Sequence, residues 1–167
     1  MVQAADRVWL KAYQPGVPAD VSLDAYRSVP DLLEQSVNRF SSKQAYECLG
    51  VPLTYDDLDR LSQDFASYLQ NVLGLHRGDR VALMMPNLLQ YPVALFGVLR
   101  AGLVAVNVNP LYTPRELEHQ LNDSGARAIV IFESVAKTLQ EIIAKTKLEA
   151  VITTQVFDLA SLPKSVL

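Results

Sequence analysis

Cysteine is nearly absent from this chain of 167 residues, in which Cys48 is the only thiol. A single cysteine excludes an intramolecular disulfide and a cysteine-rich zinc site in a monomer, and it fits a reducing compartment. Histidine is also scarce, because only His76 and His119 occur and they do not have the paired spacing of a metal motif. We therefore expect Cys48 to pack in a strand, both histidines to lie on the surface, and no residue to be assigned as a metal ligand.

Glycine is too sparse for phosphate binding. The seven glycines are dispersed, and the closest pair, Gly74 and Gly78, flanks a turn. A phosphate loop needs several neighbouring glycines so that backbone amides approach the anion, and neither GxxxxGKS/T nor GxGxxG occurs. Neither an ATP site nor a dinucleotide site can be completed from these residues, so we assign no catalytic residue and no cofactor-binding residue.

Charge of one sign is not concentrated anywhere in the chain. The net charge is -3, and the 15 basic residues are scattered from Arg7 to Lys164, which argues against nucleic acid as a partner. The leader from Met1 to Trp9 has no apolar segment before a small-residue cleavage site, so we expect no secretory signal and a cytoplasmic location. Half of the residues are apolar, which is enough for one globular core.

One apolar run, Leu88 to Val108, has the length of a membrane span. Arg100 and Gly102 interrupt it, and its second half, LVAVNV, is short and β-branched. A charge and a break at these positions are costly in a bilayer. The run therefore predicts a buried helix followed by a buried strand.

Proline and glycine gather in residues 1–30, where Pro15-Gly16, Pro18 and Pro30 predict an irregular N-terminal arm. The aromatic residues of this arm, Trp9, Tyr13 and Tyr26, need a surface to cover. Two interpretations remain open. The arm packs on its own domain, or it reaches a second subunit.

The segment that follows the arm predicts two helices around a hairpin. Pro30-Asp31 opens a helix over 32–40, and two short strands, 45–49 and 52–55, are joined by a tight turn at Gly50. Thr54 and Asp57 form a capping box for a long helix that ends at Gly74. Its apolar face is predicted to consist of Leu58, Leu61, Phe65, Leu69 and Val72.

From Gly78 onward, apolar strands alternate with helices. The strands are expected at 81–85, 103–108, 128–132 and 150–154, and the helices near 88–101, 114–123 and 134–145. Strands that are apolar on both faces and alternate with helices indicate a parallel sheet with right-handed βαβ crossovers. We therefore predict an α/β fold with an open, mainly parallel sheet and helices on both faces, in which residues 31–167 form an incomplete N-terminal α/β domain.

Polar residues occupy the carboxyl ends of several of these strands, at the edge where open α/β sheets bind ligands. Asn87 is interpreted as a helix cap, and Asn107 and Asn109 as residues that hydrogen-bond within their loop, with ligand contact as the alternative for all three. Thr113 and Glu116 flank Pro114 in a capping box, which fixes the start of a helix and does not assign a function to either residue.

Several segments together resemble the beginning of an acyl-CoA synthetase of the adenylate-forming superfamily. LTYDDLDRLS resembles the first core motif and VLRAGLVAVNVNP the second, with GDRVALMMPN between them. NPLYTPRELEHQLNDSGA and the arm segment VWLKAYQPGVPADV are similar to bacterial long-chain fatty acid:CoA ligases. The segments span 53–62, 98–110, 78–87, 109–126 and 8–21, and the resemblance fades after about Thr154.

The resemblance implies the N-terminal part of an ATP-dependent ligase, which joins a fatty acid to CoA through an acyl-adenylate. It implies ATP, Mg²⁺ and CoA as cofactors of the full-length parent, none of them bound to this fragment, whose catalytic motifs follow residue 167. We expect the fragment to be inactive and to form a homodimer or otherwise self-associate, with peripheral membrane contact at most. The alternatives are a non-enzymatic binding or assembly module and a ligase for short-chain or aryl acids.

Overall fold

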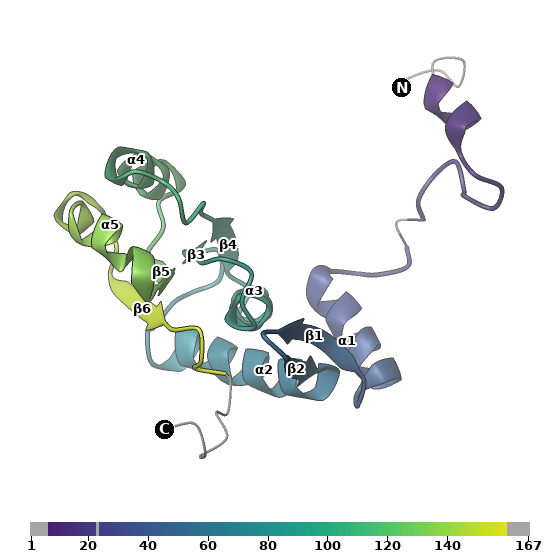
Figure 1. The fold of residues 1–167 in the computed structure, drawn as a ribbon, viewed down its shortest axis with the longest axis horizontal. Helices are drawn as coiled ribbons and strands as arrows, with labels where there is room; N and C mark the ends of the chain where they lie inside the picture. The colour runs from purple at the N-terminus through teal and green to yellow at the C-terminus, as the bar shows by residue number, and fades with distance from the viewer. Residues whose placement is uncertain (1–6, 23, 160–167) are drawn as a thin grey trace.

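A four-stranded parallel sheet organises the chain (Figure 1). The computed structural model describes residues 7–22 and 24–159. The strands are β3 (Arg80–Met84), β4 (Val104–Asn107), β5 (Ala128–Phe132) and β6 (Ala150–Thr154), in the order β4-β3-β5-β6. Ala82 pairs with Val106 on one side and with Ile129 on the other. The predicted α/β fold with a parallel sheet is confirmed, and the strand order is a result that the sequence did not provide.

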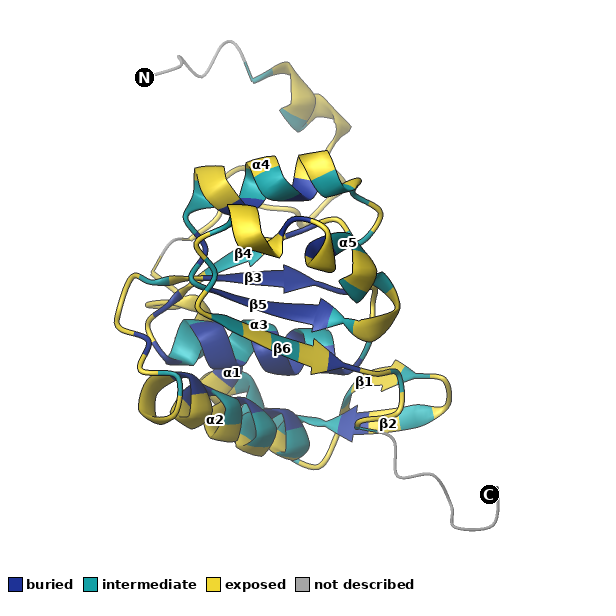
Figure 2. Ribbon diagram, turned by 90° about the vertical axis from the view of Figure 1, so that its left-hand side faces the viewer, coloured by how far each residue is buried: buried dark blue, intermediate teal, exposed yellow. Residues whose placement is uncertain are grey.

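Helices cover both faces of this sheet, as predicted. The long helix α2 (Tyr55–Asn71) and α3 (Gln90–Arg100) cover one face, and α4 (Pro114–Ser124) and α5 (Ala136–Gln140) cover the other (Figures 1 and 2). Alternate residues of the inner strands point to opposite faces. Val81 and Leu83 pack in the α2–α3 layer, whereas Ala82 and Met84 pack in the α4–α5 layer. All four are almost fully buried, which explains the uninterrupted apolar runs.

An antiparallel hairpin precedes the sheet. Strands β1 (Gln44–Cys48) and β2 (Val51–Thr54) pair with Cys48 opposite Val51, and Leu49 and Gly50 form the turn with positive φ values of 52° and 77°. A third apolar cluster joins the hairpin to α1 (Val29–Phe40) and to the first turn of α3. The hairpin is therefore held against the region where α3 begins.

Local hydrogen bonds fix where the first helices start and end. Ser28 caps α1 by accepting from the Asp31 amide at 3.2 Å, and Thr54 caps α2 by accepting from the Asp57 amide at 3.1 Å. The Asp57 carboxylate reaches back to Thr54, which completes the predicted capping box. Gly74 has the left-handed φ of 62° expected just beyond the end of α2.

Two predictions about helices are wrong in detail. The helix expected over 134–145 is broken into η3 (Glu133–Val135), α5 (Ala136–Gln140) and η4 (Ile143–Lys145), and this path buries both Leu139 and Ile142. β-branching lowers the helix propensity of Ile142 and Ile143 only slightly, so the packing of Leu139 and Ile142 in one apolar cluster decides the local conformation. Val72, assigned to the apolar face of α2, is 67% exposed because the helix has already ended at Asn71.

The apolar run Leu88 to Val108 divides as predicted into a helix, α3, and a strand, β4. Arg100 ends α3, and Gly102 turns the chain with a φ of 75°. Within residues 7–22 and 24–159, no helix has both the length and the apolar character needed to cross a membrane.

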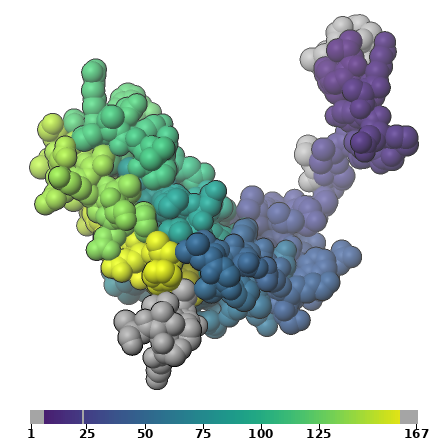
Figure 3. Space-filling model, in the orientation of Figure 1, coloured from purple at the N-terminus to yellow at the C-terminus, as the bar shows by residue number. Residues whose placement is uncertain are grey.

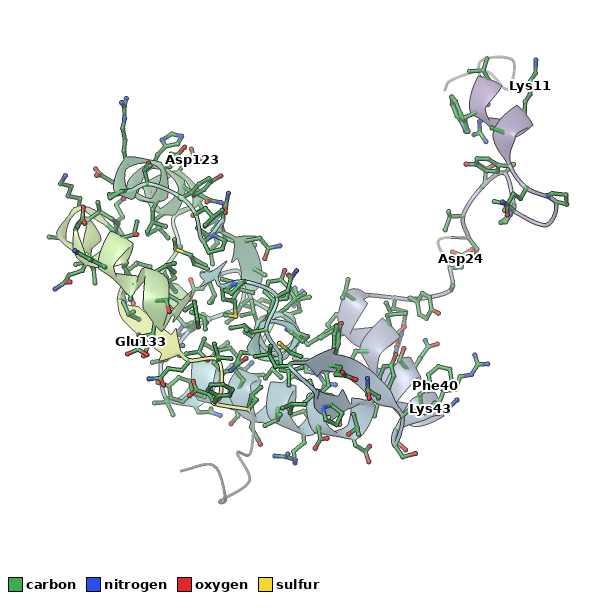
Figure 4. All side chains as sticks on the ribbon, in the orientation of Figure 1. Lys11, Asp24, Phe40, Lys43, Asp123 and Glu133 are labelled. Atoms are coloured by element: carbon green, nitrogen blue, oxygen red, sulfur yellow. The ribbon has the colours of Figure 1, made fainter. Side chains whose placement is uncertain are left out.

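The described part of the N-terminal arm projects away from the sheet and its helices (Figures 1 and 3). It contains a short 3₁₀ helix, η2 (Val8–Ala12), and an internal ion pair in which Arg7 Nη1 lies 2.6 Å from Asp20 Oδ1. Lys11 and Asp24 lie on this arm (Figure 4). At the end of α1, by contrast, the Lys43 ammonium lies over the Phe40 ring. Trp9, Tyr13 and Tyr26 are between 42% and 50% exposed, so the arm does not bury its aromatic residues on its own domain.

Candidate functional site

The chain reverses its winding direction at the carboxyl ends of β3 and β5. The connection from β3 to β4 runs through α3 on one face, whereas those from β4 to β5 and from β5 to β6 run through α4 and α5 on the other. Ligands of open α/β sheets bind in the crevice at such a switch point. The carboxyl edge of the sheet is therefore the place to look for a site.

A hollow of about 330 Å³ lies beside the carboxyl end of β3. Its wall comes from the hairpin, from the loop after β3 and from the first turns of α3. The residues that line it are Tyr46, Glu47, Cys48, Asn87, Leu88, Leu89, Tyr91, Pro92 and Leu95. The lining is mainly apolar and aromatic, as expected of a cleft that receives an organic group rather than a free ion.

Tyr46 is the ionisable wall residue of this hollow whose environment is clearly perturbed. Burial raises the pKa of the Tyr46 phenol, and the nearby hydroxyls of Tyr55 and Tyr91 act in the same direction. The phenol is therefore neutral at physiological pH. It contributes an apolar ring and a hydrogen-bonding hydroxyl to the wall.

Cys48 lies in β1, as predicted, and is half-buried at the edge of the hollow. Its Sγ donates a weak hydrogen bond to the main-chain oxygen of Asn87, at 3.8 Å. The thiol packs beside apolar residues of the hairpin cluster. Its surroundings are those of a small hydrophobic side chain.

The interpretation of Asn87 as a helix cap is wrong. Helix α3 begins at Gln90, its cap residue is Leu89, and no side chain caps its first amides. A cap at Asn87 would start the helix at Leu88, whereas α3 starts two residues later, so the loop after β3 is longer than predicted. Asn87 is exposed and forms part of the wall of the hollow instead.

Asn109 hydrogen-bonds within its loop, as predicted, whereas the same prediction for Asn107 is wrong, because its partners lie on α3 and α4. Asn109 Oδ1 accepts from the Leu111 amide at 3.0 Å, which shapes the loop after β4. Asn107 Oδ1 accepts from the Tyr91 hydroxyl at 3.1 Å, and its main-chain oxygen accepts from Gln120 Nε2 at 2.9 Å. The contacts of Asn109 are local, whereas those of Asn107 join three separate elements.

Thr113 and Glu116 form the predicted capping box at the start of α4. The Glu116 carboxylate accepts from the Thr113 amide at 2.8 Å, and the Thr113 hydroxyl accepts from the Glu116 amide at 3.4 Å. The bond from the Thr113 amide is the main reason that the pKa of Glu116 lies below its usual value. Both side chains are occupied by a structural role.

Both histidines are exposed, as predicted: His76 lies in the turn before β3 and His119 on α4. The main-chain amide of His76 donates to Asp79 Oδ2 at 2.7 Å. Across residues 7–22 and 24–159, no three His, Cys, Asp or Glu side chains are grouped to hold a metal ion. No step involving a metal is assigned to the described residues.

The geometry defines an open α/β domain with its switch point at one sheet edge. A family model described as "AMP-binding enzyme" matches residues 33–166. The chain belongs to the AMP-binding enzyme family. It is 55% identical over 161 residues to a long-chain-fatty-acid–CoA ligase of Escherichia coli O157:H7, a match that covers 96% of this chain and 29% of that protein.

Solved structures show the same fold. An anthranilate–CoA ligase in complex with anthranoyl-AMP matches with a TM-score of 0.74 at 23% identity, over 77% of this chain and 25% of that one. A long-chain-fatty-acid–CoA ligase from Archaeoglobus fulgidus matches with a TM-score of 0.73 at 24% identity, over 85% and 30%. This chain therefore spans less than a third of the length of these relatives.

Proposed function

We propose that this chain is the N-terminal part of a long-chain fatty acid:CoA ligase. In the whole enzyme, a fatty carboxylate attacks the α-phosphate of ATP, pyrophosphate leaves, and the CoA thiol then attacks the acyl-adenylate to give the thioester. The 55% identity to the Escherichia coli ligase over nearly the whole chain is the observation that carries this proposal. The family match over residues 33–166 supports the nucleotide-dependent chemistry.

Within that enzyme, the segment serves as a scaffold. Residues 1–30 form an arm, and residues 31–167 form an incomplete α/β domain whose carboxyl edge faces the nucleotide and acyl sites supplied by the rest of the enzyme. The scaffold role is supported by the side chains of Thr113, Glu116 and Asn109, which are committed to caps and turns. No catalytic or magnesium-binding residue is assigned to this segment, and in the whole enzyme ATP acts as its magnesium complex.

A long acyl chain is the preferred substrate. Relatives of this fold also include an anthranilate–CoA ligase, but its 23% identity supports the fold alone. The much higher identity to a long-chain ligase therefore outweighs it. Because long-chain fatty acids partition into membranes, we propose a cytoplasmic enzyme that touches the membrane surface without crossing it.

The test compares the full-length polypeptide that contains this segment with the chain of residues 1–167. We expect the full-length protein to release pyrophosphate and form palmitoyl-CoA from palmitate, ATP and CoA, and the 167-residue chain to do neither. Acyl-adenylate formation by the short chain would contradict the scaffold role. A full-length protein that prefers anthranilate or acetate to palmitate would contradict the long-chain assignment.

A further inference from the structure

Asn107 is held from both sides of the sheet although its side chain is exposed. It is the last residue of β4, at the carboxyl edge. Tyr91, on α3, donates its hydroxyl to Asn107 Oδ1 at 3.1 Å, and Gln120, on α4, donates its amide to the Asn107 main-chain oxygen at 2.9 Å. Because α3 and α4 lie on opposite faces, two helix layers fix one residue at the end of an edge strand.

The contact from Tyr91 does not shape the backbone. Gln120 already satisfies the main-chain oxygen of Asn107, so the Tyr91 hydroxyl only restricts the rotation of the Asn107 side chain. Ordering an exposed side chain costs conformational entropy, and it stabilises the fold little. By contrast, the side chain of Asn109 bonds to its own loop, where the bond defines a turn.

Fixing the carbonyl oxygen decides what the amide offers to a ligand. An asparagine amide has one acceptor oxygen and a nitrogen with two donor hydrogens. With Oδ1 bonded to the Tyr91 hydroxyl, Nδ2 is the group of this amide that is left to donate to a ligand. β4 adjoins β3, one of the two strands at the switch point, so this donor lies where open α/β sheets bind ligands.

We propose that Asn107 is a ligand-binding residue whose Nδ2 donates to an anionic oxygen of a substrate, a phosphate or a carboxylate. Tyr91 is the positioning residue that keeps this donor oriented before the ligand arrives, which reduces the entropy lost on binding. The inference rests on the proposed function, because that function supplies three substrates with such oxygens: ATP, CoA and the fatty carboxylate. The identity of the oxygen is left to the experiment.

The experiment uses the full-length ligase that contains this segment and measures kcat and KM for ATP, CoA and palmitate separately. The main variant is Asn107→Asp, which keeps the shape and the acceptor for Tyr91 but replaces the donor with a negative oxygen. We expect it to raise KM for one substrate by roughly 10- to 100-fold, the effect of losing a hydrogen bond to a charged group. Asn107→Ala and Tyr91→Phe should raise the same KM, the latter by less.

The matched control is Asn71→Ala, which removes an exposed asparagine whose Nδ2 bonds to Ser67 Oγ at 3.0 Å within α2. It should leave all three KM values unchanged. If wild-type enzyme lacks ligase activity, the proposed function fails and this inference fails with it. If wild-type enzyme is active and the variants at Asn107 and Tyr91 keep normal KM values, whether or not they melt earlier, only this inference is overturned. Should Asn107→Asp not fold, the other two variants decide.

Discussion

Gly97 of α3 lies directly against Phe65 of α2. A β-carbon at Gly97 would stand 2.7 Å from Phe65 Cδ1 and 3.1 Å from the main-chain oxygen of Ser62. Neither distance is a normal contact for carbon, so the two helices approach this closely only because residue 97 has no side chain. The contact holds α2 over the sheet face that α3 also covers.

Replacing this glycine should loosen the α2–α3 contact. Alanine is a better helix former than glycine by about 1 kcal/mol, but overpacking in a core costs about 1–3 kcal/mol. We expect Gly97→Ala to lower the free energy of unfolding by about 1 kcal/mol and Gly97→Val to lower it further, measured by urea denaturation. Phe65→Leu should partly rescue Gly97→Ala, and simple additivity of the two changes would contradict the contact.

Arg127 joins the amino ends of three neighbouring strands. It precedes β5 and binds Asp79, which precedes β3, while its Nε and Nη2 lie 2.9 and 2.5 Å from the two oxygens of Glu149, which precedes β6. The ion pairs of Arg60 on α2 are longer and exposed. We therefore expect Arg127→Met to lower the melting temperature more than Arg60→Met does. The difference should shrink in high salt, and equal effects of the two variants would contradict this role.

Acid should destabilise the fold by protonating carboxylates that accept hydrogen bonds or ion pairs in the folded protein. The Thr54 hydroxyl lowers the pKa of Asp57, and the His76 amide and Arg127 lower that of Asp79. A lowered folded pKa means that these carboxylates stabilise the protein fully above the unfolded value of about 3.9, and that this stabilisation is lost as pH falls through the folded pKa. In urea denaturation measured at a series of pH values, the urea concentration at the midpoint should therefore decrease once the pH is lowered below about 4.

Thr54→Ala tests the contribution of the capping box to that acid response. Loss of the N-cap hydroxyl should lower the free energy of unfolding by about 1 kcal/mol at neutral pH. The variant should then lose less on acidification than the wild type, because the hydroxyl no longer holds the Asp57 carboxylate. An acid response identical to that of the wild type would show that Asp57 contributes nothing to it.

The features that sequence predicts here are those that short segments determine. Both capping boxes, Thr54 with Asp57 and Thr113 with Glu116, depend on residues three positions apart, and both are present. β5 and β6 were also predicted with their observed bounds, and β5 in particular is buried on both faces, which leaves an uninterrupted apolar run.

The features that sequence misses depend on residues far apart in the chain. The order β4-β3-β5-β6 depends on which strands pair. The end of helix α5 at Gln140 depends on how Leu139 and Ile142 pack into the apolar cluster between α5 and the sheet. The contact between Tyr91 and Asn107 joins a helix to a strand 16 positions later. Asn107 was considered for ligand contact because of its position at the carboxyl end of a strand, but nothing in the sequence pointed to Tyr91 as its partner.

The arm should mediate self-association, and its tryptophan can report it. Val8, Trp9, Tyr13 and Val17 are between 42% and 70% exposed on a segment that stands away from the body (Figure 3). Apolar side chains exposed together favour a covering surface, and we expect a second copy of the chain to provide it. Light scattering should show a dimer or larger species whose fraction rises with protein concentration, and Trp9→Ala with Tyr13→Ala should shift it toward monomer.

Trp9 is the only tryptophan in the chain, so its fluorescence reports the arm alone. As association proceeds, its emission should move to shorter wavelength and become less accessible to acrylamide, because the indole leaves water. The matched control is Leu49→Ala, which removes an exposed side chain on the hairpin turn, 73% exposed, and should leave association unchanged. A dimer that forms without any change in Trp9 emission would place the interface away from the arm, and a monomer at high concentration would contradict self-association itself.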